Sequence, residues 1–332
     1  MTGPLIDIRG LTKTFPLPGS PLRRLTGQRP RSLTALNDVS FQIHKGEILS
    51  IVGESGSGKT TLGRALLRLE EPTAGEVLFG GQDLLKLGPG LMLAARRDLQ
   101  MIFQDPWSSL NPRLSIRQTL AEVLAVHGIA TGAGAQARIA ELLALVGLPA
   151  DAADRFPRHF SGGQRQRIGI ARALAVSPSF LVADEPVSAV DVSVQAQIMN
   201  LLIDLRDTLG LTMLMIAHDL SVVRYVSDRV GVMYLGRIVE LAPSRRIFTA
   251  ARHPYTQALL RAAPRPDPNR RVESVALQGE PPSPINPPSG CAFHTRCPFA
   301  DARCRAEVPL LTEPDAGHTV ACHHHDRITE PA

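Results

Sequence analysis

A glycine-rich stretch near the start of the sequence has the residue types and spacing that bind phosphate. Residues 53–60 read Gly-Glu-Ser-Gly-Ser-Gly-Lys-Thr and fit the pattern G-x-x-x-x-G-K-[ST]. In this pattern backbone N–H groups converge on phosphate oxygens, the lysine reaches the β- and γ-phosphates, and the last hydroxyl binds Mg²⁺. The residues predicted to bind the phosphates of a nucleotide are Gly53, Ser55, Gly56, Ser57, Gly58, Lys59, Thr60 and Thr61.

The elements around this stretch are those that the phosphate pattern requires. The apolar run over residues 48–52 predicts a buried strand before it, and residues 60–69 predict a helix after it. A helix that starts near Lys59 directs the positive end of its dipole at a bound anion. A glycine-rich turn without a ligand is the alternative interpretation, and the flanking strand and helix argue against it.

Polar residues also follow three other apolar runs that predict strands. They are Asp184 and Glu185 after residues 180–183, His218 after residues 211–217, and Gln104 after residues 101–103. Asp184 is predicted to hold the Mg²⁺ shell and Glu185 to polarise the attacking water. His218 could reach the γ-phosphate and orient that water. Singly, such residues are more often solvated strand ends, helix caps or structural groups, so their interpretation depends on the phosphate stretch.

A second element suited to an anion consists of Ser161, Gly162, Gly163 and Gln164. The hydroxyl and the flexible backbone precede a helix predicted over residues 165–175, whose N-terminus attracts negative charge. One ATP cannot contact both this element and the phosphate stretch within one compact subunit. We therefore expect two subunits arranged head to tail, each supplying this element to the nucleotide of the other.

With these motifs in order, the sequence resembles the nucleotide-binding subunits of ABC transporters over residues 5–250. The resemblance implies an ATPase in which an aromatic residue, here Phe15, stacks on adenine. Gln104 matches the Q-loop and His218 the switch histidine. The Mg²⁺ ligands that the resemblance implies are Thr60, Gln104 and Asp184.

Two further family motifs are present with mild departures. Ser161–Gln164 match the signature, which here follows Phe160 rather than the common leucine. Ser188-Ala189-Val190-Asp191 matches the D-loop, with Val190 in place of the usual leucine, and Asp191 is included among the predicted nucleotide-site residues. No residue of the family's catalytic set is missing, so the resemblance implies a site competent for hydrolysis.

The finer resemblance is to the ATPases of oligopeptide/dipeptide importers, the peptide/nickel subfamily, and most of all to the second of their two ATPase subunits. The segments that carry it are residues 104–106, 109–112, 253–256 and 283–291. It implies a subunit that energises peptide import, with a second ATPase subunit, two transmembrane permease subunits and, indirectly, an extracytoplasmic solute-binding protein. Import of nickel or another solute and a redox-regulated ABC ATPase outside transport are the alternatives.

Four cysteines lie in the last 42 residues, and the rest of the sequence has none. They are Cys291, Cys297, Cys304 and Cys322. Clustered thiols in a reducing compartment are more often metal ligands than disulfides. Because the spacing lacks the paired C-x2-C of most zinc sites, it favours a [4Fe–4S] cluster over Zn²⁺, and the subfamily resemblance implies the same. Competition from His323–His325 and unliganded buried thiols are the alternatives.

The alternation of strands and helices predicts an α/β fold, a P-loop NTPase (RecA-like) core with a parallel sheet covered on both faces. Short strands are predicted over residues 5–9 and 39–43, and helices over 117–126, 136–146 and 194–209. We expect an ABC ATPase domain over residues 1–255, with a helical subdomain at about 92–158, antiparallel strands near the N-terminus and a cysteine-rich C-terminal extension over 256–332.

Composition narrows the setting of the protein. The net charge is +5, but 32 of the 36 basic residues are arginines spread along the chain, so we expect no nucleic acid partner. No run reaches the roughly 18 apolar residues of a membrane span and no signal peptide is evident, so we expect a peripheral protein on the cytoplasmic face of the membrane. The stretch between the phosphate loop and the signature has no sustained heptads, unlike DNA-repair relatives, and one ATPase unit argues against ribosome-acting relatives.

Overall fold

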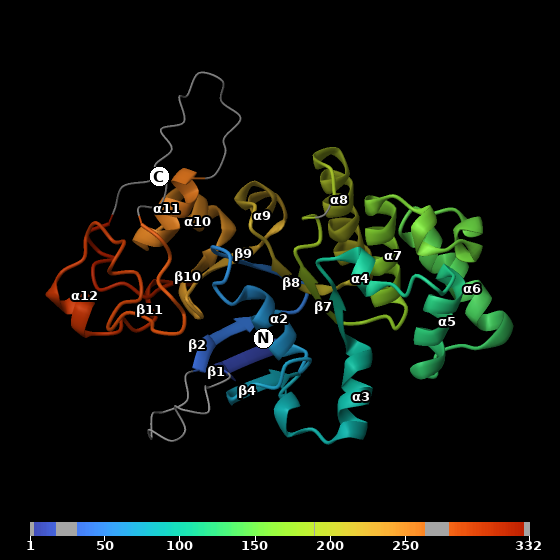
Figure 1. Cartoon of the computed structure of the whole chain (residues 1–332), viewed down its shortest axis with the longest axis horizontal. Helices are drawn as coiled ribbons and strands as arrows, with labels where there is room; N and C mark the ends of the chain where they lie inside the picture. Colours follow the sequence, from blue (N-terminus) through green and yellow to red (C-terminus); the bar gives the residue numbers. More distant parts are fainter. Residues whose placement is uncertain (1–2, 18–31, 189, 263–278, 329–332) are drawn as a thin grey trace. The chain divides into compact units, whose positions relative to one another are not determined.

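The computed structural model describes residues 3–17, 32–188, 190–262 and 279–328 (Figure 1). Residues 18–31 and 263–278 lie outside this part of the chain, as does Ala189 of the predicted D-loop. The chain divides into two compact units. The first contains Met1–Gln42, Leu49–Leu85 and Ala217–Ala332, and the second contains Ile43–Ile48 and Lys86–Ile216.

A four-stranded sheet in the first unit has the order β2-β1-β4-β5. Its strands are β1 (Ile6–Pro16), β2 (Ser32–Ile43), β4 (Ala74–Phe79) and β5 (Gln82–Asp83). Strand β1 pairs antiparallel with β4, with a register shift between Arg9 and Thr12. The second half of β2 alternates buried Val39 and Phe41 with exposed Ser40 and Gln42, the period-2 pattern of a strand with one buried face. These are the antiparallel strands expected near the N-terminus, although β1 and β2 are longer than predicted.

The first unit contains a second set of strands, and the phosphate stretch directly follows one of them, β3. Its members are β3 (Ile48–Val52), β9 (Arg229–Tyr234), β10 (Arg237–Pro243), β11 (Thr312–Asp315) and β12 (His318–Val320). Strand β3 runs parallel to β9, whereas β9, β10, β12 and β11 pair antiparallel in that order. All five residues of β3 are buried, as expected for a central strand. The antiparallel part was not predicted, since it lies beyond the last predicted strand, residues 211–217.

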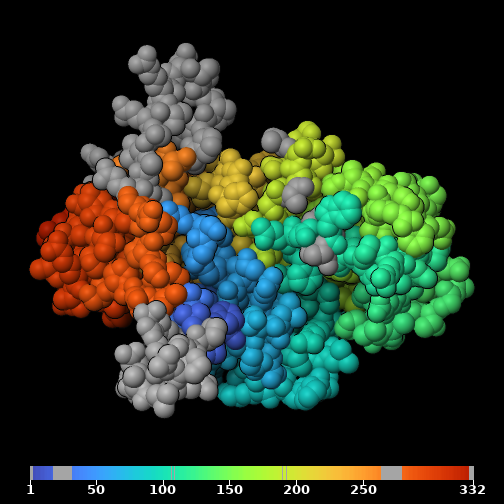
Figure 2. Space-filling view, in the orientation of Figure 1, coloured from blue at the N-terminus to red at the C-terminus, as the bar shows by residue number. Residues whose placement is uncertain are grey.

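The first unit contains a buried aromatic cluster, to which α11 (Pro254–Ala262) contributes. Its other helices among the described residues are α2 (Lys59–Leu66), α9 (Leu220–Val226), α10 (Ser244–Ala250) and α12 (Ala302–Ala306), and the 3-10 turn η1 (Leu84–Lys86) contains the boundary with the second unit. Tyr234 of β9, Tyr255 of α11 and Phe293 have ring centroids 4.6 to 5.3 Å apart. All three rings are at most 2% exposed, so Phe293 anchors in this core the described C-terminal part of the predicted region 256–332, namely residues 279–328, here named the extension. The side chains of the extension form one continuous orange-to-red surface in Figure 2.

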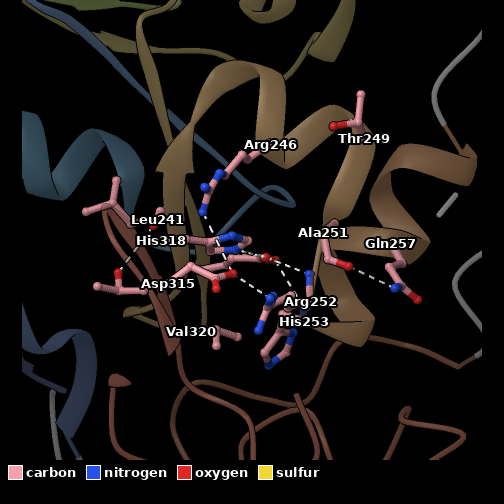
Figure 3. Close-up of polar contacts among 12 residues, drawn as sticks. Leu241, Arg246, Thr249, Ala251, Arg252, His253, Gln257, Asp315, His318 and Val320 are labelled. Atoms are coloured by element: carbon pink, nitrogen blue, oxygen red, sulfur yellow. Dashed lines mark hydrogen bonds and ion pairs between the residues drawn. The ribbon is translucent and has the colours of Figure 1, made fainter. Parts of the chain in front are cut away.

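A buried polar network also attaches the extension (Figure 3). His318 of β12 lies 2.7 Å from the carboxylate of Glu240 in β10, and neither side chain is more than 1% exposed. The backbone N–H groups of Arg252 and His253 donate to the same carboxylate. Arg252 also pairs with Asp315 at the end of β11. Burial lowers the pKa of His253 to about 4, so its imidazole is neutral, and it accepts a hydrogen bond from the Tyr255 N–H.

The second unit contains three parallel strands. They are β6 (Leu99–Ile102), β7 (Phe180–Asp184) and β8 (Thr212–Ile216), in the order β6-β7-β8. Helix α8 (Val192–Leu209) connects β7 to β8, as parallel strands require. It ends at Gly210, whose φ of 65° is the left-handed conformation of a helix C-terminus. The strand and helix predictions for this part of the chain are confirmed to within a few residues.

The remaining helices of the second unit lie between β6 and β7 in the sequence, apart from α3. They are α3 (Pro89–Asp98), α4 (Pro106–Ser109), α5 (Ile116–Val126), α6 (Gly132–Leu145) and α7 (Gly162–Leu174), with 3-10 turns η2 (Ala150–Asp154) and η3 (Pro157–His159). Helix α5 buries Ile116, Leu120 and Leu124, the spacing of one helix face. Ser115 begins it with a capping box to Gln118. The predicted helices over 117–126 and 136–146 are thus present. No helix in the described ranges is long and apolar enough to span a membrane.

Replacing His318 with alanine is expected to lower the free energy of unfolding by about 3 kcal/mol, because it leaves a buried carboxylate without its imidazole partner. Thermal denaturation followed by circular dichroism would measure the change. The matched control is Arg303→Ala, which breaks an ion pair between side chains that are 58% and 60% exposed and should leave the midpoint unchanged. Equal midpoints for both variants and the unmodified chain would contradict a stabilising role for the His318 pair.

Candidate functional site

The phosphate stretch forms a tight loop between β3 and α2, and two of its glycines cannot carry a side chain. A Cβ at Gly53 would lie 2.2 Å from the Met233 carbonyl oxygen, and one at Gly58 would lie 2.3 Å from the Ala35 carbonyl oxygen. Both residues also have positive φ, 154° and 105°. The loop therefore packs directly on the backbones of β9 and β2, and only glycine permits that approach.

Two polar side chains of the loop, those of Ser57 and Lys59, are buried. Lys59 is 6% exposed, and its ammonium donates to the carbonyls of Gly53, at 2.8 Å, and Glu54, at 3.0 Å. The Ser57 hydroxyl is buried and has no hydrogen-bond partner among the described residues. A buried hydroxyl without a partner is costly unless a ligand satisfies it. An anion bound by the loop could accept hydrogen bonds from these two side chains.

Three of the predicted catalytic and Mg²⁺-site residues lie together in the second unit. Asp184 ends β7 and is 2% exposed. The amide side chain of Gln104 donates to the Glu185 carboxylate at 2.7 Å. Glu185 has a φ of 44°, rare for a residue that is not glycine, and its N–H donates to the Ile216 carbonyl. A strained backbone conformation persists only where the surrounding structure holds it. Such conformations occur mostly at functional sites.

The predicted signature element begins helix α7. The Ser161 hydroxyl accepts from the Gln164 N–H, and the Gln164 side chain accepts from the Ser161 N–H, so the two residues form a capping box. Both are exposed, whereas Gly163 is buried. A Cβ on Gly163 would lie 2.3 Å from a methyl group of Val194 in α8, which explains glycine there. The element presents a helix N-terminus that is accessible to a phosphate.

The other residues predicted for the nucleotide site are Phe15, His218 and Asp191, and each is described within the unit that contains it. Phe15, near the end of β1, is half-buried, and the Lys13 ammonium lies 4.7 Å from its ring centroid. His218 follows β8 and is exposed. Asp191 is the N-cap of α8 and is exposed. The phosphate loop, Phe15 and His218 belong to the first unit, and the remaining motif residues belong to the second.

Four cysteines surround one small cavity in the extension. They are Cys291, Cys297, Cys304 and Cys322, and all four are free thiols. Burial raises the pKa of the Cys297 thiol to about 11 and that of Cys322 to about 12, and it also raises the pKa values of Cys291 and Cys304. A backbone hydrogen bond from the Cys291 N–H to the Cys304 carbonyl joins two of the cysteine segments.

The spacing of possible ligand atoms around this cavity bears on which metal it fits. Among the described residues, one group of three such side chains brings its ligand atoms within 4.8 Å of one another: Asp301, Cys304 and His324. This group contains a single cysteine. Tetrahedral zinc with four Zn–S bonds of about 2.3 Å would place its sulfurs about 3.8 Å apart. The four thiols therefore share a cavity but are spread more widely than a four-cysteine zinc site requires.

Two residues outside the predicted site contact the phosphate loop. The Glu54 N–H donates to the Tyr255 hydroxyl at 2.8 Å. The Glu54 carboxylate accepts two hydrogen bonds from the Arg296 guanidinium, at 2.7 and 3.0 Å. Tyr255 falls in a segment that carries the subfamily resemblance, but no local pattern marks Arg296, which lies 242 residues from its partner.

Comparisons with known protein families agree with this geometry. The ABC transporter family model matches residues 36–188, which include the phosphate loop, the signature element and the Asp184–Glu185 pair. The model described as the oligopeptide/dipeptide transporter C-terminal region matches residues 239–304. Together the fold and the loop place the chain in the class of P-loop nucleotide-binding proteins.

Individual relatives cover nearly the whole chain. The oligopeptide transport ATP-binding protein AppF of Bacillus subtilis is 48% identical over 322 residues, 96% of this chain and 97% of the relative. A protein of Brucella ovis whose name assigns it provisionally to peptide import ATP-binding proteins is 53% identical over 319 residues, again 96% and 97%. The ATP-binding cassette MJ0796, solved as a dimer bound to ADP and Pi, has a TM-score of 0.63 and 30% identity, and covers 72% of this chain and 99% of its own. The chain belongs to the ATP-binding subunits of the ABC transporter family.

Proposed function

We propose that this chain hydrolyses ATP to energise the import of oligopeptides or dipeptides across the cytoplasmic membrane. The observation that carries the ATPase activity is the glycine loop, which folds around the buried Lys59 ammonium and packs on the backbones of two strands. The match to the C-terminal region of oligopeptide/dipeptide transporters supports the peptide substrate. The names of its relatives, which refer to peptide or oligopeptide transport, support it as well.

In the proposed reaction, Lys59 and the loop amides bind the β- and γ-phosphates of ATP. Thr60, Gln104 and Asp184 would hold Mg²⁺, which when bound neutralises charge on these phosphates. The buried position of Asp184 and the contact of Gln104 with Glu185 support these assignments. Glu185 accepts a proton from the attacking water, and His218 orients the γ-phosphate region. Phe15 stacks on the adenine.

The site is completed by a second ATPase subunit, a copy of this chain or a related one. Its residues Ser161–Gln164 and Asp191 would contact the γ-phosphate bound to the first subunit. The exposed capping box at the start of α7 supports this arrangement, because a helix N-terminus there is accessible from outside the subunit. The dimeric form of the similar cassette MJ0796 also supports it.

The remaining partners follow from membership in the family. Two transmembrane permease subunits would dock near the Gln104 loop and the helical region, so that closure and opening of the ATPase dimer move them. The chain itself would bind peripherally on the cytoplasmic face, and the solute-binding protein would act indirectly. The division into an ATPase domain over residues 1–255, a helical subdomain at about 92–158 and an extension over 256–332 is part of this proposal.

For the cysteine cavity we propose a [4Fe–4S] cluster held by Cys291, Cys297, Cys304 and Cys322. The thiols surround a single cavity, and their spread suits a cluster with four iron corners better than one zinc ion. Zinc held by the group Asp301, Cys304 and His324 is the alternative that this geometry leaves.

Replacing Glu185 with glutamine should slow ATP hydrolysis by about 10² to 10³-fold while ATP still binds, because the amide cannot accept the proton of the attacking water. Phosphate release measures the rate, and size-exclusion chromatography with ATP measures dimer formation, which should increase. Glu122→Gln, an exposed acid in α5, is the matched control and should hydrolyse ATP at the unmodified rate. Unchanged hydrolysis in Glu185→Gln would remove this residue from the proposed role.

The importer assignment predicts that the tagged chain co-purifies from its native membranes with hydrophobic permease proteins and a second ATPase polypeptide. Glu185→Gln should co-purify equally well, since it keeps the docking surface. Uptake of labelled dipeptides and of Ni²⁺ by cells that lack and then regain the chain would distinguish the two substrate classes. Recovery only from soluble or DNA-bound fractions would contradict transport.

The cluster assignment predicts about four iron and four sulfide ions per chain after anaerobic purification, with visible absorbance that oxygen bleaches. Cys297→Ser should lose most of the iron, whereas His324→Ala should keep it, because His324 is not among the four thiol ligands. Zinc without iron, lost on His324→Ala, would instead support the Asp301–Cys304–His324 set. Absence of both metals would mean that the thiols are unliganded.

A further inference from the structure

We propose that Arg296 and Tyr255 position the phosphate loop, so that the C-terminal extension takes part directly in nucleotide binding. The inference rests on ATP binding at the loop, but not on the identity of the cargo or on a metal at the cysteine cavity. Arg296 and Tyr255 are positioning residues here, because they act on Glu54, the second residue of the loop, rather than on the nucleotide.

Glu54 is fixed at three points. Its backbone N–H donates to the Tyr255 hydroxyl, its carboxylate accepts two bonds from Arg296, and its carbonyl accepts a bond from the Lys59 ammonium. One residue therefore connects the phosphate-binding lysine to α11 and to the extension. Because loop amides must point at the phosphates in a fixed arrangement, groups that hold the loop backbone contribute to affinity.

The contact with Arg296 is sheltered and geometrically defined. The Arg296 side chain is 3% exposed and that of Glu54 is 23% exposed. Two parallel N–H···O bonds form the bidentate arrangement, which is stronger and more directional than a single charged contact. Exposed ion pairs contribute little, so this pair differs in kind from surface pairs such as Arg303–Glu307, whose side chains are more than half exposed.

Electrostatics give Arg296 a second role. Glu54 places a carboxylate within a loop whose ligand, a nucleoside triphosphate, is strongly anionic. The neighbouring guanidinium carries a positive charge and compensates that negative charge through its two hydrogen bonds to the Glu54 carboxylate. Loss of the guanidinium would leave an uncompensated anion in the loop, and this should weaken nucleotide binding specifically.

Arg296 is itself held by the fold of the extension. Its N–H donates to the Phe293 carbonyl at 3.0 Å, and the Phe293 ring packs against Tyr255 and Tyr234. Cys291 and Cys297 lie on either side of Arg296 in the sequence. The turn that carries the guanidinium is thus the turn that carries two of the cavity thiols, and the loop and the extension should influence each other reciprocally.

The first test is a double-mutant cycle on nucleotide affinity, measured by calorimetry with Mg²⁺ and a non-hydrolysable ATP analogue. Arg296→Gln should weaken binding by about tenfold, because Glu54 remains unpaired. In a Glu54→Gln background the same substitution should change affinity by less than about twofold, since no carboxylate is left to compensate. Equal effects in both backgrounds would overturn the proposal.

Controls separate positioning from stability. Tyr255→Phe removes only the hydroxyl and should weaken binding about threefold with a small change in thermal midpoint. Arg303→Gln makes the same chemical change as Arg296→Gln at an exposed position of the extension and should leave affinity unaltered. If Arg296→Gln and Tyr255→Phe lower the thermal midpoint while affinity stays at the unmodified value, the contacts are structural only and the proposal is wrong.

A second readout uses the reciprocity and is independent of hydrolysis. Bound analogue should slow hydrogen exchange of the amides over residues 291–297 in the unmodified chain and in Arg303→Gln, but not in Arg296→Gln measured at saturating analogue. No slowing in the unmodified chain would contradict the coupling. Lys59→Ala should abolish binding; if it binds normally, the loop assignment fails, which is distinct from failure of the Arg296 contact.

Discussion

The close approach of the glycine loop to two strand backbones is the constraint on which the site depends. Carbonyl oxygens of Met233 and Ala35 occupy the space that side chains at Gly53 and Gly58 would need. The loop is therefore seated by backbone sterics on β9 and β2, before any ligand binds. A pre-formed ring of amide donors loses less conformational freedom on binding phosphate than a mobile loop would, so the packing of glycine on backbone serves affinity as well as fold.

The extension is attached partly through polar contacts, and the geometry of these contacts defines the pairing register of strands β10 and β12. Strand β12 pairs with β10 so that Glu240 lies opposite Val320 and Leu241 opposite Thr319. In this register the His318 ring meets the Glu240 carboxylate, which also caps two backbone N–H groups. A shift of one residue would turn the alternating side chains to the other face and leave the carboxylate buried without its imidazole. Strand β12 is short and forms few backbone hydrogen bonds, so the contact between His318 and Glu240 helps to define its pairing register.

Local patterns in the sequence were enough to predict the motifs and the elements that carry them. The phosphate loop follows a contiguous pattern, and β3, β7 and β8 are short apolar runs whose residues are all buried. Helix α5 was predictable from its apolar spacing. Long-range strand pairing was not predictable. The hairpin of β9 and β10 pairs with β3 on one side and with β12 on the other, and no local pattern in residues 229–243 indicates these partners. Within the site, the groups proposed to bind phosphate form a contiguous sequence pattern, whereas the groups that contact the loop from outside it, Tyr255 and Arg296, do not.

The groups that contact the phosphate loop from outside it are distant from the loop in the sequence. One of them, Arg296, belongs to the extension, so attachment of the extension brings this side chain to the loop. Tyr255 and Arg296 lie 201 and 242 residues from Glu54, yet both contact it. Arg296 stands in a turn between Cys291 and Cys297, so any group that binds those two thiols would also restrict the turn that presents the guanidinium. A rigid turn presents a bidentate donor at smaller entropic cost than a flexible one. The cysteine cavity and the phosphate loop, which the sequence gives as separate motifs, are therefore joined through one arginine.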